Sequence, residues 1–183
     1  SARASDIPLL LNTTGSRNTA SGAYALRSNT TGYKNTASGF EALRSITGGT
    51  QNTANGALAL QSNTISDDNT ACGMFALTNT TDSRNTALGS SAGRLLTTGS
   101  DNIAIGHLGV AGESNTIRIG APGSHTRAFL TGVRGVTTGV ANAVPVLIDS
   151  AGQLGTASSS RRFKQEIRDM GETTDRLLEL RPV

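Results

Sequence analysis

Aromatic residues are scarce in this chain. Phe, Tyr and Trp together make up 3% of its 183 residues, and Trp is absent. Aromatic rings supply much of the buried area of a compact core, so their scarcity argues against an ordinary globular enzyme. The single cysteine, Cys72, excludes an intrachain disulfide framework. No run of the sequence approaches about 18 consecutive apolar residues, so no membrane-spanning helix is predicted in this segment.

Clustered positive charge is also missing. The 16 basic and 13 acidic residues give a net charge of +3, and the basic residues are scattered except for the pair Arg161-Arg162. Phosphate binding requires clustered positive charge, so we predict a solvated surface and no nucleic-acid partner. His107 and His125 lie outside any Cys/His cluster, and the pair Asp67-Asp68 does not recur. The sequence therefore predicts no metal site and no cofactor.

What the sequence has in abundance is a repeat built from small residues. Each copy begins with the pattern Asn-x-Ala-x-Gly, and the asparagines are 17, 17, 17, 16 and 17 residues apart. A degenerate copy at 115–120 follows after 13 residues and contains one extra residue. Disorder requires no such register, so the spacing favours an ordered repeat structure. The asparagines and glycines of the six copies are Asn18, Asn35, Asn52, Asn69, Asn85 and Asn102, and Gly22, Gly39, Gly56, Gly73, Gly89 and Gly106.

A period of about 17 residues is too short for a helix pair or a propeller blade. It fits two short strands and two turns, which make one coil of a parallel β-solenoid. Stacked coils place equivalent residues above one another at about 4.8 Å, where asparagines can form a hydrogen-bonded ladder. The glycine that ends each copy permits a turn with positive φ. A second series of small apolar pairs accompanies the repeat: Ala25-Leu26, Ala42-Leu43, Ala59-Leu60 and Ala76-Leu77.

The repeated unit resembles the head repeats of trimeric autotransporter adhesins, and the most similar copy is Asn102-Ile103-Ala104-Ile105-Gly106. Those heads are left-handed parallel β-rolls in which three chains pack side by side. The resemblance therefore implies an all-β chain that assembles as an intertwined homotrimer. This sequence departs from the adhesin pattern in two ways: most copies carry Thr and Ser where Val and Ile are usual, and the period is longer.

The character of the sequence changes after residue 120. Two short β-rich runs, at 128–133 and 144–149, are bounded by glycine-containing turns, and 150–155 is predicted to form a hairpin turn with its return strand. These residues suit either a small β-domain or a segment in which three chains interweave. The low content of bulky residues favours the interwoven form, so we predict a β-rich neck over 121–157.

Charged residues concentrate near the end of the sequence, where 161–183 holds 11 of the 29 charged residues. The stretch 172–175, followed by Leu177, Leu178 and Leu180, predicts a capped amphipathic helix that ends before Pro182. We expect this helix to pack against partner chains, within a domain that continues past this segment.

Residues 158–167 and 178–183 resemble the start of the intramolecular chaperone domain found in endosialidase tailspikes, other phage fibres and bacterial fibre proteins. That domain trimerises the chain and then cleaves itself from the fibre with a Ser/Lys dyad. The resemblance implies that Ser159 is the nucleophile and Lys164 the general base, since a serine hydroxyl needs a neutral amine to take its proton. Ser160 stands where many members have Asp, which makes Ser160 the alternative nucleophile.

These features predict four segments: a lead-in with a partial coil at 1–17, β-roll repeats at 18–120, the neck at 121–157 and the start of a truncated chaperone domain at 158–183. The predicted function is that of an extracellular fibre or adhesin segment, on a cell surface or a virion tail. It would display a surface for glycan or other cell-surface receptors. The only chemistry predicted is self-cleavage at the C-terminal junction.

Two other functions stay open. The first is ice binding, because a regular series of threonines on a flat solenoid face can match an ice lattice, although Ile103 interrupts the series. The second is a glycan-degrading tailspike, although no carboxylate pair recurs in a way that suggests glycoside hydrolysis. The threonine series consists of Thr19, Thr36, Thr53, Thr70 and Thr86.

Overall fold

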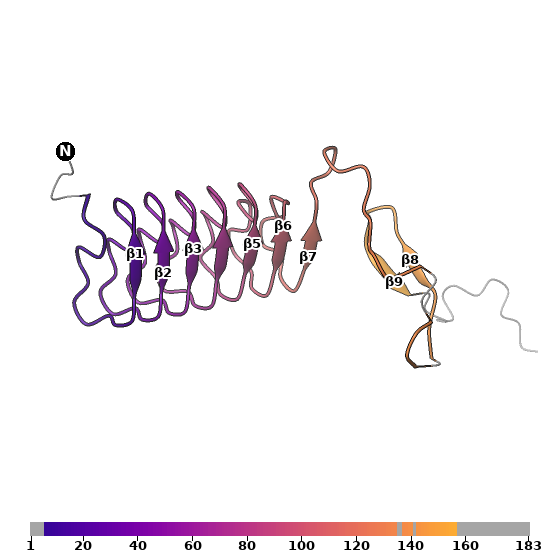
Figure 1. Ribbon diagram of the computed structural model, residues 1–183, viewed down its shortest axis with the longest axis horizontal. Helices are drawn as coiled ribbons and strands as arrows, with labels where there is room; N and C mark the ends of the chain where they lie inside the picture. The colour runs from indigo at the N-terminus through magenta and orange to yellow at the C-terminus, as the bar shows by residue number, and fades with distance from the viewer. Residues whose placement is uncertain (1–5, 135–136, 141, 157–183) are drawn as a thin grey trace, which may run out of the picture. The chain divides into compact units, whose positions relative to one another are not determined.

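The computed structural model describes residues 6–134, 137–140 and 142–156 (Figure 1). The chain divides into two compact units, Ser1–Ala128 and Phe129–Val183. The described part is all-β and contains no α-helix, and its first unit is a parallel β-solenoid of about six turns. The predicted solenoid is therefore confirmed, but each coil contains one short strand where two were expected, because the opposite side of the coil forms turns. The predicted C-terminal helix at 172–181 lies outside the described residues.

Each coil of the solenoid contributes one short strand to a seven-stranded parallel sheet, in which every strand pairs with the next along the chain. Thr19 pairs with Thr36 and Thr36 with Thr53, so the 17-residue spacing of the sequence is the register of the sheet. Figure 1 shows the coils stacked in sequence order. The strands are β1 (Thr19–Ser21), β2 (Thr36–Ser38), β3 (Thr53–Asn55), β4 (Thr70–Cys72), β5 (Thr86–Leu88), β6 (Ile103–Ile105) and β7 (Ile117–Ile119).

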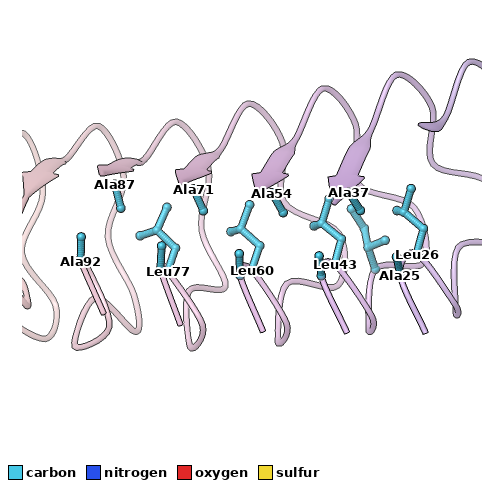
Figure 2. Close-up of a cluster of buried hydrophobic side chains, with 14 of the residues drawn as sticks. Ala25, Leu26, Ala37, Leu43, Ala54, Leu60, Ala71, Leu77, Ala87 and Ala92 are labelled. Atoms are coloured by element: carbon cyan, nitrogen blue, oxygen red, sulfur yellow. The ribbon is translucent and has the colours of Figure 1, made fainter. Parts of the chain in front are cut away.

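The core of the solenoid is narrow and made of small side chains. From β2 to β6 the middle residue of each strand is a buried alanine, while its two neighbours are exposed. Figure 2 shows these alanines facing alanines and leucines that come from the opposite side of the coil. We call that opposite side the second wall; it consists of residues 24–27, 41–44, 58–61, 75–78 and 91–94. Only small and medium side chains fit between two backbone walls this close, which explains the scarcity of aromatic residues.

The leucines of the second wall adopt a backbone conformation that their sequence does not predict. Leu26, Leu43, Leu60 and Leu77 are fully buried, and each has a φ between 48° and 50°. A bulky residue in the left-handed region costs roughly 1–2 kcal/mol. The stacking of coils offsets this cost, because each leucine N–H donates to an alanine carbonyl of the next coil, as Leu43 does to Ala59 at 3.0 Å.

The glycine column that ends the strands gives a first stability prediction. Gly56 has φ +137°, and a Cβ added there would lie 2.5 Å from the carbonyl oxygen of Gly73 in the next coil. We expect Gly56→Ala to lower the free energy of unfolding by about 2–3 kcal/mol in urea denaturation, from backbone strain and collision together. Gly48→Ala is the control, because its Cβ would meet only the side chain of Thr31 at 3.2 Å. Equal losses in both variants would contradict this account.

The two ends of the solenoid differ. At the N-terminal end a partial coil covers the first complete one: Leu9 packs against the core, and its N–H donates to the Ala25 carbonyl at 3.0 Å. At the C-terminal end Arg118 occupies the position that alanine holds in the earlier strands. Its Nε donates to Glu113 Oε2 at 2.8 Å, so an ion pair closes the apolar interior. Such polar termination is typical of the last repeat in stacked structures.

The register of the last coil differs from the one expected. β6 pairs with β7 so that Ile103 opposes Ile117, an offset of 14 residues instead of the 13 that separate Asn102 from Asn115. Thr116 therefore takes the asparagine position, and its N–H donates to Asn102 Oδ1 at 3.1 Å. Asn115 takes the preceding position with φ 56°, a left-handed conformation that asparagine tolerates well.

The second unit contains an antiparallel hairpin of β8 (Val146–Ile148) and β9 (Leu154–Thr156). Asp149 Oδ1 accepts hydrogen bonds from the N–H groups of Ala151 and Gln153, both at 2.9 Å, which fixes the turn. The predicted hairpin is present. The expected strand at 128–133 is not, because those residues form turns and coil, with no neighbouring strand to pair with.

Candidate functional site

The predicted self-cleavage residues lie outside the described part of the chain. Ser159, its alternative Ser160 and the base Lys164 all fall within 157–183, so their mutual geometry has no description. Self-cleavage therefore stays a prediction from resemblance.

The structure stacks the repeated asparagines into a ladder inside the solenoid. From Asn35 to Asn102 they are fully buried or nearly so. From Asn35 to Asn85 each Oδ1 accepts the backbone N–H of the next asparagine in the stack, and Asn102 Oδ1 accepts that of Thr116. These distances are 2.9 Å from Asn52 to Asn35 and 3.0 Å from Asn69 to Asn52. Each coil is thus tied to the next by a side chain at the start of its strand.

The amide nitrogens of the ladder make a second set of contacts. Nδ2 of Asn35 donates to the Gly49 carbonyl at 2.7 Å, and Nδ2 of Asn52 donates to the Ser66 carbonyl at 2.7 Å. Both acceptors belong to the turn that leads into the next strand. Donor and acceptor atoms of these amides are used within the fold, so the ladder stabilises the coil and offers little to a ligand.

The outward face of the sheet carries two columns of exposed side chains, and their character changes along the stack. One column runs from threonine in β1–β5 to isoleucine in β6 and β7, and the other from serine to leucine and isoleucine. The exposed fractions of Ile117 and Ile119 are 65% and 71%. We call the C-terminal part of this face the apolar sheet patch; its members are Leu88, Ile103, Ile105, Ile117 and Ile119.

The second unit also exposes its apolar side chains. Every residue that the structure describes between 129 and 156 is exposed, including both faces of the hairpin. The exposed fraction is 85% for Phe129 and 69% for Ile148. A lone two-stranded hairpin without a covered face is marginally stable in water at best. The described residues of this unit therefore leave these side chains without a covering.

One cluster of titratable groups lies at the C-terminal end of the solenoid and contains His107, Glu113 and Arg118. His107 Nδ1 accepts the backbone N–H of Gly109 at 2.8 Å. Partial burial and the positive charge of Arg118 lower the pKa of His107, while the carboxylate of Glu113 opposes that shift. Glu113 is engaged on both oxygens, since Oε1 accepts the Val110 N–H at 2.9 Å and Oε2 binds Arg118. Every group has a structural partner, so this cluster is a cap and not a reaction centre.

We expect this cap to make the stability of the solenoid depend on pH. The folded chain holds His107 with a lowered pKa, so the unfolded chain binds the proton first, and stability decreases as the pH falls below the unfolded value of about 6.5. His107→Asn keeps an acceptor for the Gly109 N–H but cannot titrate. We expect it to shrink the drop in thermal midpoint between about pH 7.5 and about pH 5. His125→Asn is the control, because exposed His125 holds only a surface turn, and the drop should persist there. An unchanged drop in His107→Asn would count against the cap.

The remaining sequence candidates have ordinary structural settings. Asp67 Oδ1 accepts the N–H and the hydroxyl of Thr50 at 2.6 and 2.9 Å, which bridges two turns. Cys72 is exposed in the outward serine column, between Asn55 and Leu88 of the neighbouring strands. Within the described ranges no group of three His, Cys, Asp or Glu side chains could hold a metal ion.

Residues 6–134, 137–140 and 142–156 contain no helix long and apolar enough to cross a membrane. Comparison of the chain with protein-family models, curated protein sequences and solved structures finds no match.

Proposed function

We propose that this chain is a segment of a homotrimeric extracellular fibre that displays a binding surface for glycan or other cell-surface receptors. The observation that carries the proposal is the exposure of apolar side chains in the second unit, from Phe129 to Leu154. Burial of such side chains is the main favourable term in association, and each large one contributes about 1.5–3 kcal/mol when covered. A chain that leaves them all exposed is better stabilised in contact with copies of itself.

The apolar sheet patch supports the same proposal from the first unit. Its side chains project from a regular parallel sheet, so they form a flat surface with a regular spacing. Copies of one chain related by symmetry present the same surface to one another, which makes flat apolar faces suited to closed homo-oligomers. The threonines on the same face of the sheet, such as Thr36 and Thr53, would extend this contact toward β1 and would bury less apolar surface.

The number three and the assembly route come from the two family resemblances. In the proposal, residues 158–183 begin a chaperone domain that brings three chains together, and Ser159 with Lys164 releases it afterwards. The solenoid supplies a rigid rod, because every coil is bonded to its neighbours through backbone, asparagine and threonine hydrogen bonds. A rod of this kind holds repeated surface groups at fixed spacing, which is what a multivalent receptor-binding fibre needs.

Light scattering on the intact chain tests the assembly. We expect a mass of three chains at micromolar concentration, with near-complete protection of the second unit from proteolysis. A monomeric mass, together with a circular dichroism spectrum that shows a folded solenoid, would contradict the fibre proposal.

Ice binding is the second candidate, favoured by one observation. The threonines of β1 to β5 pair in register and are all exposed on the sheet face. Successive strands lie about 4.8 Å apart, which gives a regular array of hydroxyl and methyl groups. Thermal hysteresis of the purified chain separates this candidate from the fibre, which should produce none.

A further inference from the structure

Three of the four aromatic residues of the solenoid lie on the second wall or directly beside it. Tyr24 and Phe75 begin their wall segments, and Phe40 directly precedes one. Tyr24 and Phe40 come from adjacent coils, and their rings meet edge to face with centroids 5.8 Å apart. Phe40 leaves 48% of its surface exposed in spite of this contact. The wall therefore presents an aromatic surface that the fold does not bury.

Two arginines stand beside this aromatic pair. The guanidinium carbon of Arg27 lies 5.3 Å from the centre of the Tyr24 ring, and that of Arg44 lies 6.0 Å from the same centre. Both arginines occupy the last position of their wall segments, one coil apart. Guanidinium groups that stack on a ring are held in place while their N–H donors stay available at the edge.

A carboxylate and an amide orient one of the two arginines. Glu41 Oε2 forms an ion pair with Arg44 Nη1 at 3.2 Å and accepts a hydrogen bond from Gln61 Nε2 of the next coil. Arg27 is held differently: its Nε is buried against the wall and makes no hydrogen bond. A guanidinium has five N–H donors, so burial of Nε leaves the donors of the two terminal nitrogens. The cluster thus combines an exposed ring with two positioned cations and a single anion.

We propose that Phe40, Tyr24, Arg27 and Arg44 form a binding site for an acidic saccharide, with a sugar ring on Phe40 and its carboxylate on the two guanidinium groups. The inference rests on the proposed function, which places the sheet face in contact with other chains and leaves the second wall outward. It goes further by naming the site and the class of glycan.

The chemistry of the cluster favours this ligand over a simple anion. The C–H face of a pyranose ring is apolar and packs against an aromatic ring, while a planar carboxylate matches the paired donors of arginine. A plain phosphate or an acidic peptide would use the arginines without Phe40. A neutral saccharide would use Phe40 without the arginines. Because Glu41 already pairs with Arg44 Nη1, the ligand carboxylate would use Arg27 and the remaining donors of Arg44.

The test measures binding of the full chain to polygalacturonate, with dextran as neutral polysaccharide and poly-glutamate as acidic peptide. We expect binding to polygalacturonate only. Phe40→Ala and Arg27→Ala should each weaken it about tenfold, and Arg27→Lys should weaken it less, because it keeps the charge but loses the planar fork. Arg94→Ala is the matched control: Arg94 stacks on Phe75 at 5.6 Å on the same wall, away from the cluster. Its affinity should stay within about twofold of the unaltered chain.

Several outcomes would overturn the inference. Equal binding to dextran or to poly-glutamate, or an equal loss in Arg94→Ala, would show general surface attraction in place of a site. If Arg27→Ala does not fold, the polygalacturonate affinities of Phe40→Ala and Arg27→Lys still test the site. Mass measurements on the same samples keep the two proposals apart: a monomer that binds polygalacturonate contradicts the fibre alone, and a trimer that does not bind contradicts the site alone.

Discussion

Replacing Asn52 with leucine is expected to lower the free energy of unfolding by about 3–4 kcal/mol, the largest loss from a single side chain in the solenoid. Asn52 is fully buried in the middle of the asparagine ladder. Its Oδ1 accepts the N–H of Asn69 at 3.0 Å, and its Nδ2 donates to the carbonyl of Ser66 at 2.7 Å. Leucine has a similar volume but satisfies neither group.

The expected loss follows from the groups left behind. The Asn69 N–H and the Ser66 carbonyl would both be buried without a partner, and each such group costs about 1–3 kcal/mol. The gain from burying a leucine side chain offsets part of this cost, but Asn52 lies between two coils whose backbones are already in contact. The substitution also removes the bonds from Asn52 Nδ2 to Asn35 Oδ1 at 3.2 Å and to the Thr50 carbonyl at 3.1 Å. Asn35 Oδ1 still accepts the Asn52 backbone N–H at 2.9 Å, so the preceding step of the ladder is weakened but keeps one bond.

Urea denaturation at a fixed protein concentration measures this effect, because the stability of an oligomer depends on concentration. Thr53→Val is the matched control: Thr53 is the next residue, points outward and tolerates a β-branched replacement. We expect that control to change the free energy of unfolding by less than about 0.5 kcal/mol. A loss of less than about 1 kcal/mol in Asn52→Leu would mean that water or a coil rearrangement replaces the ladder.

The second large effect concerns assembly. In a chain with Ile105→Asp and Ile119→Asp, we expect the proposed trimer to be replaced by monomers while the solenoid stays folded. Both side chains project from the outward face of the sheet, and Ile119 is 71% exposed in the single chain. Ile105 is less exposed, at 37%, but its side chain also lies outside the core, so we expect the isolated solenoid to tolerate both substitutions. In an assembly they would bury several carboxylates without partners, at a cost of several kcal/mol for each.

Sedimentation or light scattering, together with circular dichroism, measures this outcome. Ile65→Asp is the matched control, because Ile65 is equally exposed, at 71%, but lies in a turn outside the apolar sheet patch. It should leave the mass unchanged. A double variant that keeps the mass of the unaltered chain would place the contact elsewhere and remove the sheet patch from the proposal.

The repeat could be predicted from sequence because a solenoid converts sequence period into spatial register. Asn18, Asn35 and Asn52 lie 17 residues apart, and the fold stacks them in that order. The same logic fails where the period changes. The last coil aligns Thr116 and not Asn115 with Asn102, because strand pairing and the tolerance of asparagine for a left-handed backbone decide the register there.

The second wall shows a different limit of prediction from sequence. Alanine and leucine are strong helix formers, yet Leu43 and Leu60 adopt positive φ in tight turns. The hydrogen bonds that each turn makes with the next coil outweigh the helix preference of these residues. The proposed aromatic site could not be predicted from the sequence either. Tyr24 and Phe40 occupy different positions of the repeat, so no regular spacing links them. The stacking of coils brings the centroids of their rings to 5.8 Å.

The sequence by itself determined the coil, its period and its asparagine ladder, because identical short units can bury their small side chains only by stacking in register. The tertiary structure decided which side chains face outward. Strands of three residues are too short for alternation to reveal an inner face, and burial arises only when the coil closes around Ala54 and Leu60. That closure exposes the isoleucines on one wall and the aromatic and arginine residues on the other, and with them the two surfaces through which this protein is proposed to act.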